Sequence, residues 1–413
     1  MKRNWKILTA GAVALSLSAS LFAGCSGGKD DGKTHIEFFS SKVENASTYK
    51  EIIKEFEKKN PKIAVDLSSP PDAGTVIKTR LTKNDMPDIV AMGDDTTFTD
   101  LANSGVLQDL SGADAVENIQ PTYIDMVKKD YKNHDAVFGI PYATNGNGVI
   151  YNKEKLAALG IKETPKTWDE FVADLDKAKE AGEIPIYFTL KDAWTGMVAL
   201  NSVASSISPD QFAEDKTAGK TSFQESYDEV ADKLLTLSKY GHKDNVGVAY
   251  GDGNTAFANG KGVFYLQGNW AIPELLKANP DVKVGVFPFP ATNDPSKNNL
   301  VSGIDVLFGL TKDTKHEKEA KKFISFLLDK EQAQKYTDEQ SAFSAVKDVY
   351  QNDPKLEGYK ASFESGQITS YPDHFYPTGM NAANILQEFF IKKDKDKFLK
   401  TMDKEWDKVI DRK

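Results

Sequence analysis

HIEFFSSKVENASTYKEIIKEFEKKNPKIAVDL, residues 35–67, carries the pattern that decides the fold of this chain. Residues 35–40 form an apolar run of strand length that ends in serine, so we expect a buried strand that leads into a loop. Between Tyr49 and Phe56 the apolar side chains recur at helical spacing, and Asn60-Pro61 ends that helix. The alternation of apolar residues at positions 63–67 predicts a second strand.

A third strand is expected at residues 88–92, after a second helical segment. The order strand, helix, strand, helix, strand predicts a parallel α/β sheet. Ligands of such sheets bind beyond the carboxyl ends of the strands. Ser40 and Ser41 follow the first strand, and Asp94 and Asp95 follow the third, so we expect these four residues at the binding edge.

The same alternation continues along the rest of the chain. Thr48 with Glu51 and Thr167 with Glu170 have the spacing of capping boxes at helix starts. The remaining expectations are a polar, flexible loop at residues 140–148, strands at residues 149–151, 183–188 and 262–266, an apolar helix stripe at residues 320–328 and a helical segment at residues 382–410.

The N-terminus reads as an export signal. Residues 1–24 combine a positive start with a mostly apolar run that is too short and too polar for a membrane span. Phe22-Ala23-Gly24-Cys25 resembles the lipobox of bacterial lipoproteins, although Phe22 stands where leucine is usual. The resemblance implies cleavage before Cys25 and its lipidation, with residues 25–33 as a flexible tether; the alternative is an ordinary signal peptide with an incidental cysteine.

Charge and cysteine content exclude several classes. Without the three cations of the signal, the net charge falls from −9 to −12, which disfavours nucleic acid as a partner. Cys25 is the only cysteine, so no disulfide forms within the chain and burial must hold the fold.

No catalytic motif is recognisable. The sequence has no Gly-x-Ser-x-Gly elbow and no His-Glu-x-x-His pair, and its five histidines lack metal-ligand spacing. Gly219-Lys220-Thr221 resembles the end of a phosphate-binding loop, but Glu214 stands where its first glycine is required. Residues 251–256 match a dinucleotide-binding glycine pattern, yet they lack the acidic residue it needs and are read as a turn into a helix. We therefore expect no catalytic residue, no metal and no cofactor.

Aromatic and polar side chains gather on the loops that follow strands. A flat ring can cover the apolar face of a sugar, while carboxylates and amides bind its hydroxyl groups. Trp270 follows a Gly-Asn turn and is the favoured stacking residue, whereas packing explains Trp194 equally well. The candidate ligand contacts are Ser41, Asp94, Asp95, Tyr142, Asn145, Trp194, Trp270 and Asp305.

Several segments, taken in order, carry a family resemblance. They are Pro87-Asp88-Ile89-Val90 with Gly93-Asp94-Asp95, Gly139-Ile140-Pro141-Tyr142 with Tyr151-Asn152-Lys153, residues 165–171, residues 257–260 with Gly268-Asn269-Trp270, and Ser302-Gly303-Ile304-Asp305. Through them, residues 34–413 resemble the extracellular solute-binding proteins of carbohydrate ABC importers, the family 1 group related to maltose-binding protein.

The resemblance implies an α/β fold of the two-lobed periplasmic-binding-protein-like type II, with hinged lobes that each have a central sheet flanked by helices. Lobe 1 would comprise residues 34–143 and 304–341, and lobe 2 residues 144–303 and 342–413. The chain would cross between them near residues 144–148, 301–304 and 341–344. The sugar-contacting tryptophan of the family maps onto Trp270 and its acidic contact onto Asp94 or Asp95, of which we favour Asp95; Asn145, Trp194 and Asp305 carry over less directly.

By the same resemblance the chain is expected to be a monomeric receptor, not an enzyme. It would sit on the extracellular face of the bacterial cell membrane through its lipid anchor. There it would bind a small-molecule carbohydrate, expected to be an oligosaccharide, and deliver it to the transmembrane subunits of an ABC permease. The alternatives are a receptor for a polyamine, peptide or phosphate ester, a surface glycoside hydrolase that uses paired carboxylates, and an adhesive lipoprotein.

Overall fold

Strand β1 (Thr34–Ser40), helix α1 (Ala46–Lys59) and strand β2 (Ile63–Ser68) form where the opening sequence pattern predicts them. In the computed structural model, which describes residues 31–129, 131, 133–377 and 379–412, β1 pairs in parallel with β2 and with β3 (Ile89–Met92). The predicted parallel α/β start of the chain is therefore confirmed. The signal peptide, Cys25 and the tether up to residue 30 lie outside the described residues.

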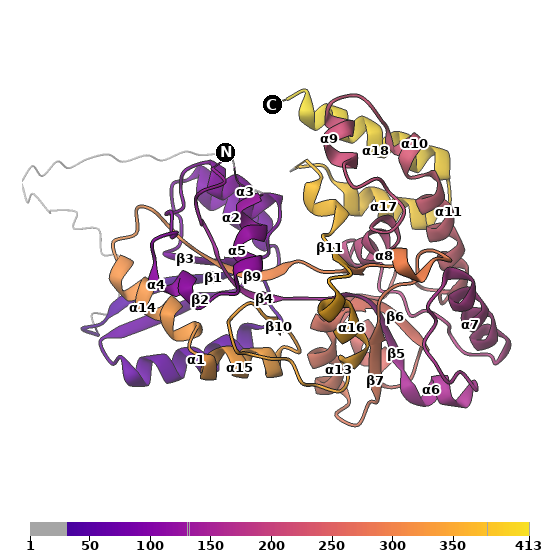
Figure 1. Ribbon diagram of the computed structural model, residues 1–413, viewed down its shortest axis with the longest axis horizontal. Coiled ribbons are helices and arrows are strands. Elements are labelled where there is room, and N and C mark those ends of the chain that lie inside the picture. Colours follow the sequence, from indigo (N-terminus) through magenta and orange to yellow (C-terminus); the bar gives the residue numbers. More distant parts are fainter. Residues whose placement is uncertain (1–30, 130, 132, 378, 413) are drawn as a thin grey trace, which may run out of the picture.

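Two lobes make up the molecule, as Figure 1 shows. Lobe 1 holds a six-stranded sheet in the order β10-β4-β9-β3-β1-β2, and lobe 2 holds a five-stranded sheet in the order β11-β8-β5-β6, with β7 pairing to β5. The further elements of lobe 1 are α2 (Ala73–Thr82), α3 (Thr96–Asn103), α4 (Asp114–Glu117), α5 (Pro121–Lys129), β4 (Ile140–Thr144), β9 (Ile304–Leu310), α14 (Glu317–Leu327), α15 (Lys330–Glu339) and β10 (Phe343–Ser344). Those of lobe 2 are β5 (Asn147–Asn152), α6 (Lys153–Ala158), α7 (Trp168–Glu180), α8 (Trp194–Ala204), α9 (Phe212–Thr217), α10 (Phe223–Ser226), α11 (Asp228–Leu237), η1 (Ser238–Tyr240), α12 (Tyr250–Ala258), β6 (Phe264–Gly268), η2 (Asn269–Ala271), α13 (Ile272–Ala278), β7 (Val284–Phe287), η3 (Pro295–Lys297), β8 (Leu300–Val301), α16 (Glu357–Ser365), β11 (Ile368–Thr369), η4 (Pro372–Phe375), α17 (Ala382–Lys392) and α18 (Lys395–Ile410).

Strand alternation sends side chains to opposite faces of the lobe 1 sheet. Phe38 packs with α1 and α14 on one face, where its ring lies 5.3 Å from that of Phe323. Its neighbour Phe39 packs on the other face with Ile77 and Phe98. Lobe 2 has two hydrophobic clusters of its own, and no cluster among the described residues takes its buried members from both lobes. Separate cores make each lobe a separate packing unit.

Buried hydrogen bonds tie together the segments that cross between the lobes. Ser302 Oγ donates to the carbonyl oxygen of Asn145 (2.6 Å), which joins the crossing between β8 and β9 to the crossing between β4 and β5. Asn269 accepts from the Gly146 amide (2.5 Å) and donates to the Ser341 carbonyl oxygen (2.9 Å). Ser302 therefore joins two crossing segments, and Asn269 of lobe 2 joins the first crossing to Ser341 of lobe 1.

The third crossing differs from its expected place near residues 341–344. β10 pairs with β4 in the lobe 1 sheet, and Val349 is still buried in a lobe 1 cluster. Leu356 is the next residue buried with lobe 2. The chain therefore crosses between Val349 and Leu356, because the β4 pairing keeps it in lobe 1.

Three local expectations were wrong. Residues 140–148 are two strands joined at Asn145 and Gly146, because pairing with β9 and β6 satisfies their backbone. Thr48 is no helix cap: α1 begins earlier, and the Thr48 hydroxyl donates to Glu339. Residues 183–188 contribute only a bridge from Ile186 to Phe264, since Pro185 has no amide hydrogen to offer. The helical segment expected at residues 382–410 is confirmed as two helices, α17 and α18, separated at Lys393, whose φ is +59°. The capping box of Thr167 and Glu170 is confirmed.

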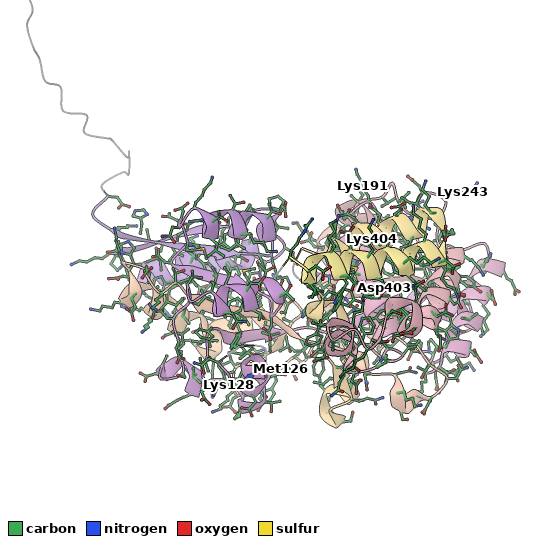
Figure 2. All side chains as sticks on the ribbon, turned by 90° about the horizontal axis from the view of Figure 1, so that it is seen from above. Met126, Lys128, Lys191, Lys243, Asp403 and Lys404 are labelled. Atoms are coloured by element: carbon green, nitrogen blue, oxygen red, sulfur yellow. The ribbon has the colours of Figure 1, made fainter. Side chains whose placement is uncertain are left out.

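Among the described residues, no helix has the length and apolar character needed to cross a membrane. Figure 2 shows the molecule from above, with Asp403 and Lys404 marking α18 on the outside of lobe 2.

Replacing Asn269 with alanine is expected to lower the free energy of unfolding by about 2 kcal/mol, because a buried polar group left unpaired costs ~1–3 kcal/mol. Two backbone groups, on Gly146 and Ser341, would lose their partner. Urea unfolding measures the change. Asn259→Ala, which removes an exposed local hydrogen bond to Thr255, is the matched control. Equal stability of the two variants would show that Asn269 does not brace the crossing.

Candidate ligand-binding cleft

A cleft lies between the lobes, at the ends of the lobe 1 strands that the topology rule selects. It consists of three adjoining hollows of about 550, 540 and 560 Å³. Asp95 of lobe 1 and His374 of lobe 2 line all three. The hollow of about 550 Å³, which we call the central hollow, is lined by six of the expected ligand contacts: Ser41, Asp95, Asn145, Trp194, Trp270 and Asp305.

Asp95 is held in place by the helix that follows it. Its Oδ1 accepts hydrogen bonds from the Thr97 amide (2.7 Å) and the Phe98 amide (3.0 Å), and so caps α3. Oδ2 takes no part in these bonds. The carboxylate is thus oriented by one oxygen and leaves the other for a hydrogen-bond donor in the cleft.

Trp270 lies in η2, directly after β6, and lines the central hollow from lobe 2. A side chain at Gly268 would meet the Trp270 ring at 2.0 Å, so only glycine lets the indole fold back over β6. The indole Nε1 donates to Gln267 Oε1 (3.2 Å), which fixes the rotation of the ring. The ring packs at its edges against the lobe 2 core and is only partly buried. Its position is therefore set before any ligand arrives.

Trp194 opens α8 and is 44% exposed, which is unusual for so large an apolar side chain. Its ring meets the Tyr250 ring edge to face, with 4.9 Å between centroids. The backbone amide of Tyr250 donates to Asp192 Oδ2 (2.7 Å), and this bond holds Tyr250 in place. Trp194 and Trp270 thus both line the central hollow and the hollow of about 540 Å³ next to it.

Asp305 and Asn145 already have protein partners. Lys42 Nζ lies 2.7 Å from both oxygens of Asp305, and Asn145 Nδ2 donates to the same carboxylate (2.8 Å). Tyr371 Oη in turn donates to Asn145 Oδ1 (2.7 Å). Burial opposes the charge of Lys42, but the carboxylates of Asp305 and Glu44 outweigh it and raise the pKa of Lys42. This chain of bonds links the floor of the cleft to the crossing segments.

Tyr142 is not brought to the cleft. It lies in β4 with 1% of its surface exposed, and its ring packs 4.8 Å from those of Phe308 and Tyr336 in the lobe 1 core. The expectation failed because residues 140–144 form a buried strand instead of a loop. Asp94 does line the cleft, but in the hollow of about 560 Å³ and not in the central one.

Sequence reasoning missed several lining residues. Lys42 follows β1 directly, so the rule that selected Ser41 could have found it. Tyr371, Asp373 and His374 belong to the segment around η4, where no motif marks them. The rings of Tyr371 and His374 stack at 4.7 Å, and Gly303 provides the space for them.

Asp373 carries a destabilised charge. Burial raises the pKa of Asp373, and the nearby charge of Asp95 adds to this, while His374 and Asn201 act in the opposite direction. Its Oδ1 is buried without a hydrogen-bond partner among the described residues. A buried carboxylate oxygen of this kind gains from a hydroxyl group that can donate to it.

No group of three or more histidine, cysteine, aspartate or glutamate side chains is placed to hold a metal ion in the described part of the chain. What the cleft does bring together is aromatic surface from one lobe and carboxylates from both. That combination suits a ligand with apolar faces and many hydroxyl groups.

Comparison with known proteins gives consistent results. A sequence profile for the family described as bacterial extracellular solute-binding protein matches residues 40–334. The multiple sugar-binding protein of Streptococcus mutans is 31% identical over 89% of this chain and 91% of its own length. The melibiose/raffinose/stachyose-binding protein MelE of Bacillus subtilis is 25% identical over 89% and 88%. Among solved structures, RafE in complex with raffinose superposes with a TM-score of 0.81 at 25% identity, covering 92% of this chain and 100% of that one.

Replacing Asp373 with asparagine is expected to stabilise the fold near pH 7 and to change it little near pH 4. Because the folded pKa is raised, the folded state holds its proton more tightly than the unfolded chain, so the stability it contributes is lost as pH rises through that pKa. Asparagine cannot ionise and avoids this loss. Urea unfolding at both pH values measures the effect, with the exposed Asp281→Asn as control. A gain of the same size at both pH values would rule out ionisation of Asp373 as its source.

Proposed function

This chain belongs to the family of bacterial extracellular solute-binding proteins, and on that premise we propose that it is a receptor for an oligosaccharide, which it binds between its lobes and delivers to an ABC permease. The type II solute-binding fold expected from the sequence is confirmed. The oligosaccharide, the residues that contact it and the mode of delivery are the parts that we propose.

The observation that carries the proposal is the arrangement of the central hollow. Trp194 and Trp270 of lobe 2 line it together with the Asp95 carboxylate of lobe 1. A sugar ring would place its C–H face on an indole and its hydroxyl edge against the free oxygen of Asp95. Because the contacts come from both lobes, a bound sugar would favour the closed arrangement of the cleft.

The names of similar proteins support the same ligand class. The Streptococcus mutans relative is named for multiple sugars, and the Bacillus subtilis relative for melibiose, raffinose and stachyose. RafE was solved with raffinose. These sugars are built from two or more units, so we propose an oligosaccharide of similar size for this chain.

The remaining parts of the proposal concern where and how the receptor works. Lipidation of Cys25 would hold it at the extracellular face of the cell membrane, within reach of the permease. The lobes would close and open about the three crossings, as hinged binding proteins do.

We propose a monomer, because the exposed large apolar side chains of the described residues are few: Val43, Trp194, Val246, Tyr350, Phe375 and Ile391. The family is one of transport receptors, and we propose no catalysis in this cleft.

Trp270→Ala is expected to remove most of the sugar affinity while the fold is kept, because the variant loses the stacking surface and little of the core. Isothermal titration of wild type and variant with one panel measures it: glucose, galactose, maltose, maltotetraose, melibiose, raffinose, stachyose, xylobiose and xylotetraose. A wild type saturated at 100 times its Kd should also gain ~2.7 kcal/mol of stability.

The matched control is Trp168→Ala, a tryptophan that packs against Phe289 outside the cleft. Unchanged affinity of Trp270→Ala would remove Trp270 from the site. Silence of the wild type across the panel, with binding of spermidine instead, would replace the sugar by a polyamine. Release of free monosaccharide during titration would indicate a hydrolase.

Cys25→Ser is expected to abolish incorporation of palmitate, because the acyl chains have no other cysteine to attach to in this sequence. Metabolic labelling of expressing bacteria with palmitate measures the change, and the nearby Ser26→Ala serves as control. Palmitate labelling of the Cys25→Ser protein at the level of the wild type would contradict lipid attachment at this residue.

A further inference from the structure

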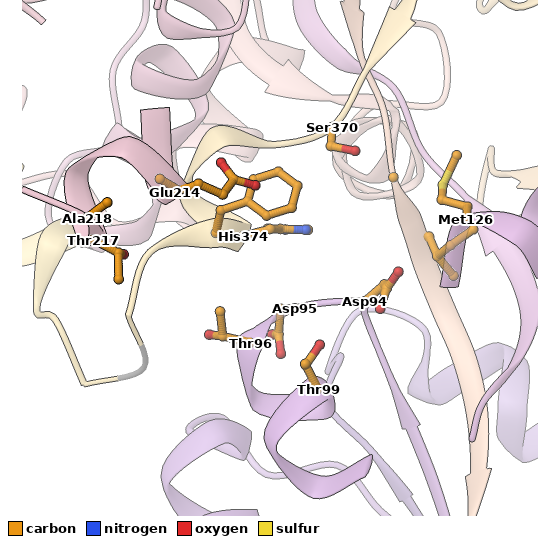
Figure 3. A pocket seen from close by; sticks show the side chains of 14 residues that line it. Asp94, Asp95, Thr96, Thr99, Met126, Glu214, Thr217, Ala218, Ser370 and His374 are labelled. Atoms are coloured by element: carbon orange, nitrogen blue, oxygen red, sulfur yellow. The ribbon is translucent and has the colours of Figure 1, made fainter. Parts of the chain in front are cut away.

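The hollow of about 560 Å³, which we call the outer hollow, lies beyond the central hollow and holds neither tryptophan. Lobe 1 contributes α3 and Met126 of α5 to it, and lobe 2 contributes α9 and the segment around η4. Figure 3 shows Thr96 and Thr99 on one side and Glu214 and Thr217 on the other. The outer hollow continues the cleft, because Asp95 and His374 line both.

The outer hollow shares with the central hollow an exposed aromatic ring and carboxylates from its lining. Phe375 is 47% exposed there, although it is large and apolar. Carboxylates come from both lobes, on Asp94 and Glu214. Hydroxyl groups come from Thr96, Thr99, Thr217 and Ser370. An exposed ring surrounded by carboxylates and hydroxyls offers a sugar the same two kinds of contact that Trp270 and Asp95 offer.

Helix α9, which forms part of the lobe 2 side of the outer hollow, is held in place by α18. Lys216 of α9 is buried and forms ion pairs with Asp403 and Asp407 of α18. Asp403 also accepts the Phe223 amide (2.7 Å), which starts α10. Because these bonds anchor α9 to α18, Glu214 stands at a defined place on the rim.

The volume of the outer hollow also suits sugar units. Pockets of roughly 300–1,000 Å³ bind ligands of drug size, so the outer hollow has room for sugar rings in addition to those in the central hollow. An oligosaccharide that starts on Trp270 and continues past Asp95 and His374 would enter the outer hollow without leaving the cleft.

We propose that the outer hollow binds the further units of the same oligosaccharide, with Phe375 as the stacking residue that sets the preference for longer chains. This inference rests on the proposed function and adds to it a minimum length of ligand. Monosaccharides and disaccharides fill the central hollow, and only longer sugars reach Phe375.

Isothermal titration with two length series tests the inference: melibiose, raffinose and stachyose, and maltose with maltotetraose. Wild type is expected to bind the longest member of the preferred series most tightly. Phe375→Ala is expected to raise the Kd for that member about tenfold, which corresponds to losing roughly 1.4 kcal/mol of aromatic contact. The Kd for the disaccharide should stay within about twofold of the wild-type value. Phe375→Tyr keeps the ring and should restore the preference.

Tyr350→Ala is the matched control, since Tyr350 is an exposed ring (64%) that lines none of the three hollows. If Phe375→Ala lowers the affinity equally for sugars of every length, or lowers it for none, the inference is overturned and the proposed function still stands. A wild type that binds disaccharide and tetrasaccharide equally would overturn the inference in the same way. A wild type that binds no sugar of the full panel would overturn the proposed function and the inference with it.

Discussion

The cleft depends on the buried hydrogen bonds that tie the crossing segments together. Each lobe has its own clusters of buried apolar residues, so burial of apolar surface mostly stabilises the lobes themselves. The ring contact between Phe343 of β10 and Phe363 of α16 (4.3 Å between centroids) joins the lobes, but positioning the crossing segments requires directional bonds. That task falls to Ser302, which holds Asn145, and to Asn269, which holds Gly146 and Ser341. Directional bonds at a few points leave the rest of the interface free for a ligand.

The same network reaches into the ligand site. Asn145 bonds Asp305 through its amide nitrogen and Tyr371 through its amide oxygen, and Lys42 balances the charge of Asp305. A ligand that touches Tyr371 or Lys42 therefore touches residues that also hold the crossings. In a hinged receptor this is a direct route by which binding can favour one arrangement of the lobes.

The sequence predicted the parts that follow from local pattern. Apolar spacing located β1, α1 and β2, and the rule for strand ends placed Asp95 at the cleft. Trp270 was selected because it follows a Gly-Asn turn, and the structure explains the glycine: any side chain at Gly268 would strike the indole. Whether Asp95 and Trp270 contact a ligand stays a prediction.

The misses come from partners that are distant in sequence. Tyr142 was read as a loop residue because the pairing of β4 with β9 leaves no mark in residues 140–148. Asn145 and Asp305 look like free ligand contacts until Lys42 and Tyr371 are seen to bond them. The segment with Tyr371, Asp373 and His374 carries no local pattern at all, since only the fold brings it to the cleft.

A crystal structure of the protein grown with stachyose, or with the panel sugar that it binds best, would show where the ligand lies. We expect density for the sugar between the lobes, with a ring on the Trp270 indole and a hydroxyl group bonded to Asp95 Oδ2. Sugar density elsewhere on the protein, or an ordered sugar in the cleft that contacts neither residue, would contradict this expectation.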